Sequence, residues 1–285
     1  MDIYLDMNIF ISYIKQENIN LVKVLNYAIK NTSIYFPYSP AHIEEIAVIN
    51  RKSKDSKMHI SQNLKIISKI CKNYEYLPTV SNGIKTLDES PSICYKRVVE
   101  DYNNTTIRAE GIEKEKTNKW KSLKISLNEN ELNSINPTEL FIKKEIIDSL
   151  KVYIDEQLLP SLKNTEIFAK EKGLTFNLAP LYEYLKTKKI PSSSILQNNH
   201  KIIEILFELI FDFLDYIGYK NDKKVIKKEK YRSRMHDISH SIYATKADYL
   251  ITNDENFKCK SIAIYKLLNF KTIVISPNNL DILTS

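Results

Sequence analysis

Short apolar runs alternate with helical periodicity over the first fifty residues of the chain. The run 3–5 (IYL) predicts a buried strand, and apolar residues at helical spacing predict one helix over about 9–30. The run 33–39 (SIYFPYS) is rich in β-forming residues. A second helix follows it, with Ser39 as its N-cap and Pro40 at its first position. This order of elements is typical of the start of a parallel α/β sheet.

The same alternation returns towards the C-terminal end. We expect a helix over 236–247, a strand over 248–252, a less clearly patterned helix over 260–270 and a final strand over 271–276. Between the two α/β parts, roughly residues 50–230, long helical periodicities dominate, and one further strand is predicted near their start (YEYLPTV). The pattern therefore predicts an α/β fold with a large helical insertion.

Composition narrows the class of protein. The α/β core is expected at residues 1–50 and 232–285, with a mainly helical insertion at 51–231, and 285 residues suffice to bury such a core. With 4 glycines and no Gly-rich phosphate-binding motif, the sequence does not indicate a nucleotide-binding loop. Three widely separated cysteines, no apolar run of bilayer length and no signal sequence predict a cytoplasmic protein without a membrane segment.

The chain is basic, with 42 lysines and arginines against 35 acidic residues and a net charge of +7. Such an excess favours a polyanionic partner, nucleic acid first. Much of it lies in residues 222–234, where a phosphate backbone could be held and an aromatic ring could stack on a base. The expected contacts are Lys227, Lys228, Lys230, Tyr231, Arg232 and Arg234. A solvated basic linker is the alternative interpretation of this segment.

Acidic residues stand at comparable positions in the two α/β parts. Asp6 directly follows the first strand, and Asp254 lies just past the strand 248–252. Asp237 is expected to open its helix, whose N-terminus a right-handed crossover brings to the same edge of the sheet. Because ligands bind at the carboxyl ends of strands in open parallel sheets, we expect these acids to converge there. Each could instead cap a helix or end a strand.

Converging carboxylates suggest a metal. Crowded carboxylates raise each other's pKa values, and a hard divalent cation with oxygen ligands removes that penalty. Such a cation can make hydroxide from water and neutralise charge on a phosphodiester, so the residue types fit a Mg²⁺- or Mn²⁺-dependent phosphodiesterase. Glu44 or Glu45 in the second helix would be the fourth acid, and helical periodicity does not decide between them.

The segments IYLDMNIF and ADYLITNDENF resemble the two ends of a PIN domain, a fold of metal-dependent nucleases found in many prokaryotic toxin and defence proteins. In that family the first strand runs into an Asp, as at Asp6. A later aliphatic strand is followed by Thr, a variable residue, Asp and soon an aromatic, as from Thr252 to Phe257. The resemblance covers about residues 1–50 and 232–276, and the middle of the chain is far longer than in a minimal PIN domain.

The resemblance implies a three-layer α/β/α open parallel sheet and a catalytic metal site. Its ligands would be Asp6, Glu45, Asp237 and Asp254, where Glu45 followed by Ile46 fits the family pattern better than Glu44. It also implies Mg²⁺ or Mn²⁺ as the cofactor, endonucleolytic cleavage of RNA, and, by analogy, a toxin or phage-defence role. The supporting candidates are Asn8, Glu44, His240, Thr252 and Asn256, and Asn256 stands where family members often have an Asp.

Other functions fit the same residues. DNA could replace RNA as the substrate, and a degenerate acidic site would leave a nucleic-acid-binding scaffold protein. A hydrolase of small phosphorylated substrates could use the same sheet edge. The broad apolar stripe over residues 202–217 predicts packing inside the protein, or alternatively a homodimer interface or a seat for a neutralising or activating protein.

Overall fold

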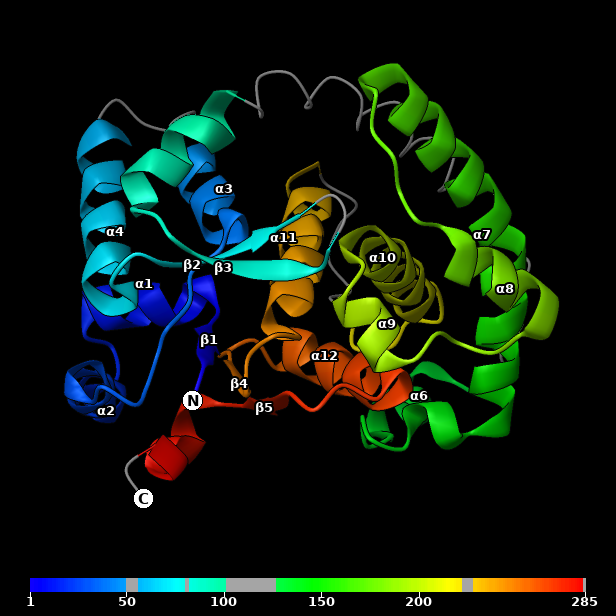
Figure 1. Ribbon diagram of the computed structural model, residues 1–285. Helices are drawn as coiled ribbons and strands as arrows, with labels where there is room; N and C mark the ends of the chain where they lie inside the picture. The colour runs from blue at the N-terminus through cyan, green and yellow to red at the C-terminus, as the bar shows by residue number, and fades with distance from the viewer. Residues whose placement is uncertain (50–55, 80–81, 101–126, 222–227, 284–285) are drawn as a thin grey trace.

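A small parallel sheet lies at the centre of the fold. The computed structural model describes residues 1–49, 56–79, 82–100, 127–221 and 228–283. The sheet has the order β1-β4-β5, and its strands are β1 (Ile3–Leu5), β4 (Tyr249–Ile251) and β5 (Ile273–Ile275). The pairing is parallel, with Leu5 opposite Ile251 and Ile251 opposite Ile275. Segments from the two ends of the chain therefore build one sheet, and the predicted α/β class is confirmed (Figure 1).

The helix predicted over 9–30 is wrong in one respect, because the structure has two helices there. These are α1 (Met7–Lys15) and α2 (Ile19–Lys30). Gln16 ends α1 in a left-handed conformation with φ 54°, and the side chain of Asn18 caps α2. Local turn chemistry therefore interrupts a continuous apolar periodicity.

The run 33–39 does not form a full strand. It contributes only isolated parallel bridges, from Tyr35 to Asp2 and from Tyr38 to Glu75. Proline at position 37 lacks the N–H that a strand ladder requires, which accounts for the interruption. The helix α3 (Pro40–Ile49) begins directly after Ser39, as the sequence predicts.

The middle of the chain is mainly helical but contains a hairpin. After α4 (Ser56–Cys71), β2 (Tyr74–Pro78) pairs antiparallel with β3 (Ile84–Asp88). The strand predicted at YEYLPTV corresponds to β2, whereas β3 was not predicted, because its side chains are mostly exposed and carry little apolar signal. A helical stretch over residues 91–100 follows.

The remaining helices follow in the later part of the chain (Figure 1). They are α6 (Glu129–Ser134), η1 (Leu140–Ile142), α7 (Lys144–Lys172), α8 (Ala179–Thr187), α9 (Ser193–Gln197), α10 (His200–Tyr216), α11 (Lys228–Ala244), α12 (Glu255–Leu268) and η2 (Pro277–Leu283). The last of them, η2, lies beside α2 near the N-terminus (Figure 1). The apolar stripe of α10 is buried against α7, α11 and α12, so it belongs to the core of this chain. In the described part of the chain, every helix is too short or too polar to span a bilayer.

Residues on β1 point alternately into two hydrophobic cores. Ile3 and Leu5 belong to the core that includes α1, α2 and α4, whereas Tyr4 belongs to the core that includes α7, α10, α11 and α12. Leu250 and Ile251 of β4 divide between the same two cores. Both faces of the sheet are therefore covered, and polar chemistry is left to the ends of its strands.

The helix α11 begins earlier than predicted. It already starts at Lys228, so Asp237 lies well inside the helix and not at its beginning. Residues 228–235 are good helix formers without apolar periodicity, which explains why the sequence did not predict their helix. The early turns are tied to α10 and α12 by a group that we call the interhelical ion pairs: Asp212, Asp215, Arg234 and Lys260.

Candidate metal centre at the carboxyl edge of the sheet

Asp6 lies where β1 ends. Its backbone N–H donates to the carbonyl of Ile251 at 2.9 Å, which extends the sheet register by one residue. Asp6 is also the N-cap of α1, yet its side chain makes no capping hydrogen bond. Asp6 is 7% exposed, and its carboxylate accepts hydrogen bonds from other side chains. Asp6 is therefore more than a helix cap.

The hydroxyl of Thr252 and the amide of Asn8 hold the Asp6 carboxylate. Thr252 Oγ1 donates to Asp6 Oδ2 at 2.6 Å, and Asn8 Nδ2 donates to the same oxygen at 2.5 Å. The N–H of Asn253 donates to Asn8 Oδ1, which fixes the amide orientation. Burial raises the pKa of the Asp6 carboxyl above its ordinary value, although the charge of His240 and the Thr252 hydrogen bond act in the opposite direction.

Asp254 has a structural role and lies beside the same group. Its Oδ1 accepts the N–H of Phe257 at 2.8 Å and caps α12. The N–H of Asp254 donates to Thr252 Oγ1 at 3.0 Å, so one hydroxyl connects the backbone of Asp254 to the carboxylate of Asp6. Asn256 lies in the first turn of α12.

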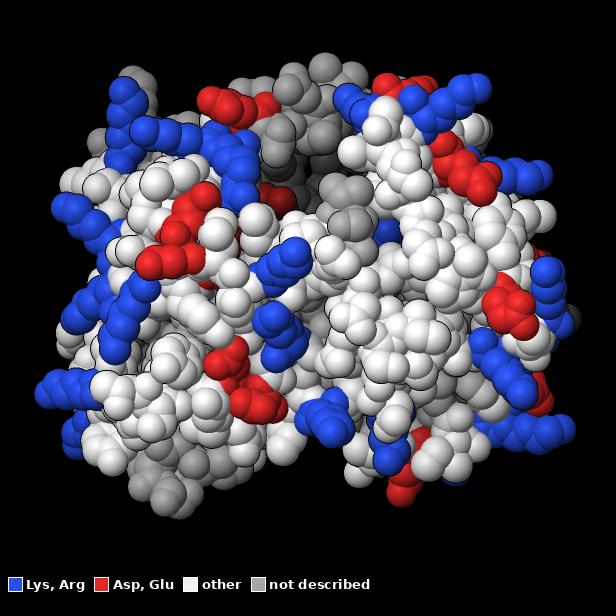
Figure 2. All heavy atoms as spheres, viewed as in Figure 1, with Lys and Arg blue, Asp and Glu red and all other residues white. Residues whose placement is uncertain are grey.

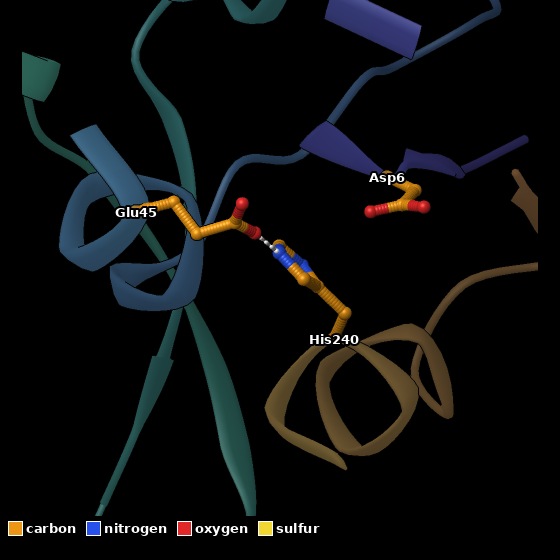
Figure 3. Close-up of side chains that lie close together, drawn as sticks. All are labelled: Asp6, Glu45 and His240. Atoms are coloured by element: carbon orange, nitrogen blue, oxygen red, sulfur yellow. Dashed lines mark hydrogen bonds and ion pairs between the residues drawn. The ribbon is translucent and has the colours of Figure 1, made fainter. Parts of the chain in front are cut away.

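Glu45 and His240 approach Asp6 from two helices (Figure 3). Glu45 is on α3 and His240 on α11, and His240 Nε2 lies 2.6 Å from Glu45 Oε1. Burial lowers the pKa of His240, but the hydrogen bond and charge of Glu45, with Asp6 and Asp237, outweigh burial and raise the pKa overall. The pKa of Glu45 is lowered overall, because the hydrogen bond and charge of His240 outweigh the effect of burial. The hydrogen bond between the two side chains therefore favours the charged form of each partner.

Asp237 shares the electrostatic environment of the other acids. Burial raises its pKa well above the ordinary value, and the charges of Asp6, Asp254 and Glu45 raise it further, against the charge of His240. The charges of the other three predicted acids therefore all act on Asp237. We call the four acids the sheet-edge cluster: Asp6, Glu45, Asp237 and Asp254.

Glu44 lies near this cluster but has a different partner. It lines a neighbouring cavity, and its Oε2 lies 3.9 Å from His236 Nδ1. Burial raises its pKa to about 7, while the charge of His240 lowers it and those of Glu45 and Glu204 raise it. The two adjacent glutamates of α3 therefore have different neighbours: Glu44 lines the cavity, and Glu45 lies beside Asp6.

A buried hydrogen-bond chain behind His240 was not predicted. His240 Nδ1 lies 2.8 Å from the hydroxyl of Tyr4, which lies 2.6 Å from Ser39 Oγ. The N–H of Ser39 donates to His42 Nδ1, so His42 Nε2 carries the ring proton and donates to the carbonyl of Leu5 at 2.6 Å. Burial, together with the charge of His240, holds the pKa of His42 well below its ordinary value. A lone buried histidine gives no sequence signal for such a chain.

The geometry allows a metal ion. Ligand atoms of Asp6, Glu45 and His240 lie within 4.8 Å of one another. Glu75, Glu89 and Cys94 form a second such group, but one guanidinium nitrogen of Arg97 lies 2.8 Å from Glu75 Oε1 and 2.9 Å from Glu89 Oε2. This second group already has a cation of its own, so the sheet-edge cluster is the better metal candidate.

The predicted nucleic-acid contacts are described only in part. Lys227 lies outside the described residues, as do the side chains of Lys228, Lys230, Tyr231 and Arg232. Arg234 contacts Asp212, and its Nε lies 3.0 Å from Asp215 Oδ2, so its charge is engaged inside the protein.

Comparison with known proteins adds no relative. No family model, no curated protein and no solved structure matches the chain.

Proposed function

We propose that the protein is a Mg²⁺- or Mn²⁺-dependent endoribonuclease with a PIN-like active site and a PIN-like three-layer fold. The observation that carries this proposal is that ligand atoms of Asp6, Glu45 and His240 lie within 4.8 Å of one another at the carboxyl edge of a parallel sheet. The charges of Asp6, Asp254 and Glu45 also act on Asp237, and these acids come from segments up to 248 residues apart. Burial and mutual repulsion raise the pKa of Asp237 strongly, which an added divalent cation would relieve.

The residues fit such a cofactor. Asp6, Glu45, Asp237 and Asp254 offer the oxygen ligands that Mg²⁺ and Mn²⁺ prefer. The bound ion would lower the pKa of a water molecule and offset the charge of the phosphodiester.

The other side chains orient these ligands. Thr252 and Asn8 fix one oxygen of Asp6, which leaves the second oxygen to point towards the cluster. His240 fixes Glu45, and the chain through Tyr4 and Ser39 to His42 fixes His240. Hydrogen bonds of this kind set ligand orientation and basicity.

RNA is the substrate that the PIN resemblance favours, and DNA is the alternative. The net charge of +7 supports either polymer. A toxin or phage-defence role belongs to the proposal only by analogy with the family.

The test is cleavage of labelled single-stranded RNA and DNA by purified protein with Mn²⁺, Mg²⁺ or EDTA. We expect metal-dependent endonucleolytic cuts in RNA and a loss of more than about 100-fold in Asp6→Asn, beyond the cost of removing a supporting hydrogen bond. Asp155→Asn is the matched control, since Asp155 pairs with Lys188 at the surface. Cleavage of DNA alone would select the alternative substrate, and equal activity of Asp6→Asn and wild type would contradict the proposed site.

A further inference from the structure

A cavity of about 430 Å³ lies beside the sheet-edge cluster. It is bounded by α3, the β2–β3 hairpin, the end of α7 and the start of α10. Figure 2 shows the molecule hollowed between the α3 and α7 sides, with atoms of acidic residues on the wall of the hollow. The lining side chains used below are Glu44, Phe168, Phe176, His200, Lys201 and Glu204.

The cavity adjoins the sheet-edge cluster through the contact between α3 and α11. Glu44 lines the cavity, and the adjacent Glu45 lies in the cluster. Tyr243 lines the cavity one helical turn after His240, which contacts Glu45. This adjacency would let a polymer whose phosphodiester lies at the cluster reach the cavity with a neighbouring nucleotide.

Aromatic side chains give the cavity a surface for a flat ring. Phe168 is 37% exposed although it lies on a helix that packs into the core. Phe176 lies under the ammonium group of Lys201, which is 5.6 Å from the ring centroid. Nucleobases stack on such rings whatever their sequence, because every base has a π-face.

The cations that line the cavity are paired with carboxylates and do not favour a phosphate. Arg97 contacts Glu75 and Glu89. Lys201 Nζ lies 2.9 Å from one oxygen of Glu204, and His200 Nε2 lies 3.0 Å from the other. These partners hold the pKa of Glu204 at about 2 against the effect of burial, so it is a carboxylate at neutral pH. A carboxylate keeps further lone pairs and only accepts hydrogen bonds, which suits an amino group on an uncharged ring.

We propose that this cavity binds the base of the nucleotide next to the cleaved phosphodiester, stacked on Phe176, with an exocyclic amino group donating to Glu204. Adenine, cytosine and guanine carry such a group, whereas uracil and hypoxanthine do not. The identification of this base as part of an RNA substrate rests on the proposed function.

The test is calorimetric binding of nucleoside 5′-monophosphates to the full chain in EDTA, where no cleavage occurs. AMP, CMP and GMP should bind at least about tenfold more tightly than UMP and IMP, and Phe176→Leu should weaken all binding by about tenfold. Glu204→Gln should remove the preference for amino-bearing bases. Tyr27→Leu, at an exposed tyrosine on α2, is the matched aromatic control and should bind as wild type does.

Phe176→Leu keeps an apolar side chain against the core, and circular dichroism checks that each variant is folded. No saturable binding, equal binding of UMP and GMP, or unchanged binding by Phe176→Leu would overturn the base site. The base-site proposal and the proposed nuclease activity can fail separately. If the protein cuts neither RNA nor DNA but shows the predicted base preferences, the base site is supported and the proposed activity is contradicted.

Discussion

Two buried groups of carboxylates in this protein are neutralised in different ways. The interhelical ion pairs match Asp212 and Asp215 with Arg234 and Lys260, so two acids meet two cations of the chain. In the sheet-edge cluster the charges of three acids act on Asp237 and His240 opposes them, and in the described part of the chain no lysine or arginine pairs with these acids. The first group has as many cations as acids, whereas the second has more acids than cations.

This difference in pairing indicates that the interhelical ion pairs stabilise the fold, whereas the sheet-edge cluster suits a ligand. Paired charges between α10, α11 and α12 hold those helices together, and removing one partner leaves the other buried without compensation. Clustered charges of one sign cost folding energy until a cation binds, and strongly perturbed carboxylates of this kind concentrate at functional sites.

The largest expected effect is on stability, in the interhelical ion pairs. Asp212→Asn should lower the free energy of unfolding by about 3 kcal/mol, because Asp212 is 2% exposed and its loss leaves the partly buried Arg234 to share Asp215 with Lys260. Asp237→Asn should leave the stability of the metal-free protein unchanged or raise it, since it removes a repelled charge. Urea unfolding in EDTA measures both. If Asp237→Asn were the more damaging substitution, the comparison would fail.

A smaller effect is expected from metal binding. Mn²⁺ at 100 times its dissociation constant should stabilise the wild type by about 2.7 kcal/mol, because the ion binds the folded chain and not the unfolded one. The same titration should give little stabilisation in Asp237→Asn, whereas Asp155→Asn should respond as wild type does. The measurement is the urea midpoint with and without Mn²⁺. An equal shift in all three proteins would place the ion outside the sheet-edge cluster.

The smallest effect concerns pH and Glu44. Its pKa rises from 4.5 to about 7 in the folded protein, so the folded state holds this proton more tightly than the unfolded chain does. The resulting stability is present below pH 4.5 and is lost as the pH rises towards 7. Glu44→Gln should therefore flatten the fall of the urea midpoint across this window in EDTA. The change is modest because the side chain is 39% exposed and solvent screens it. Parallel curves for variant and wild type would contradict this assignment.

Much of the sheet-edge cluster follows from local sequence. Apolar strands that end in Asp6 and shortly before Asp254 indicate the carboxyl edge of a parallel sheet, and β1, β4 and β5 lie where they are predicted. Asp237 was predicted at the same edge because it was expected to begin its helix, but it lies inside α11. Its helix continues through polar residues that periodicity cannot register.

The sequence by itself determined the three strands of the parallel sheet and most of the helices, because the apolar period of a strand or helix is a property of neighbouring residues. Only the tertiary structure decided which of two adjacent glutamates approaches Asp6 and that His240 joins Glu45 to Tyr4. It also decided that Arg234, predicted to contact nucleic acid, contacts Asp212 inside the protein. Each of these choices depends on a partner at least 22 residues away, from Arg234 to Asp212 up to Tyr4 to His240, and long-range contacts leave no period in the chain.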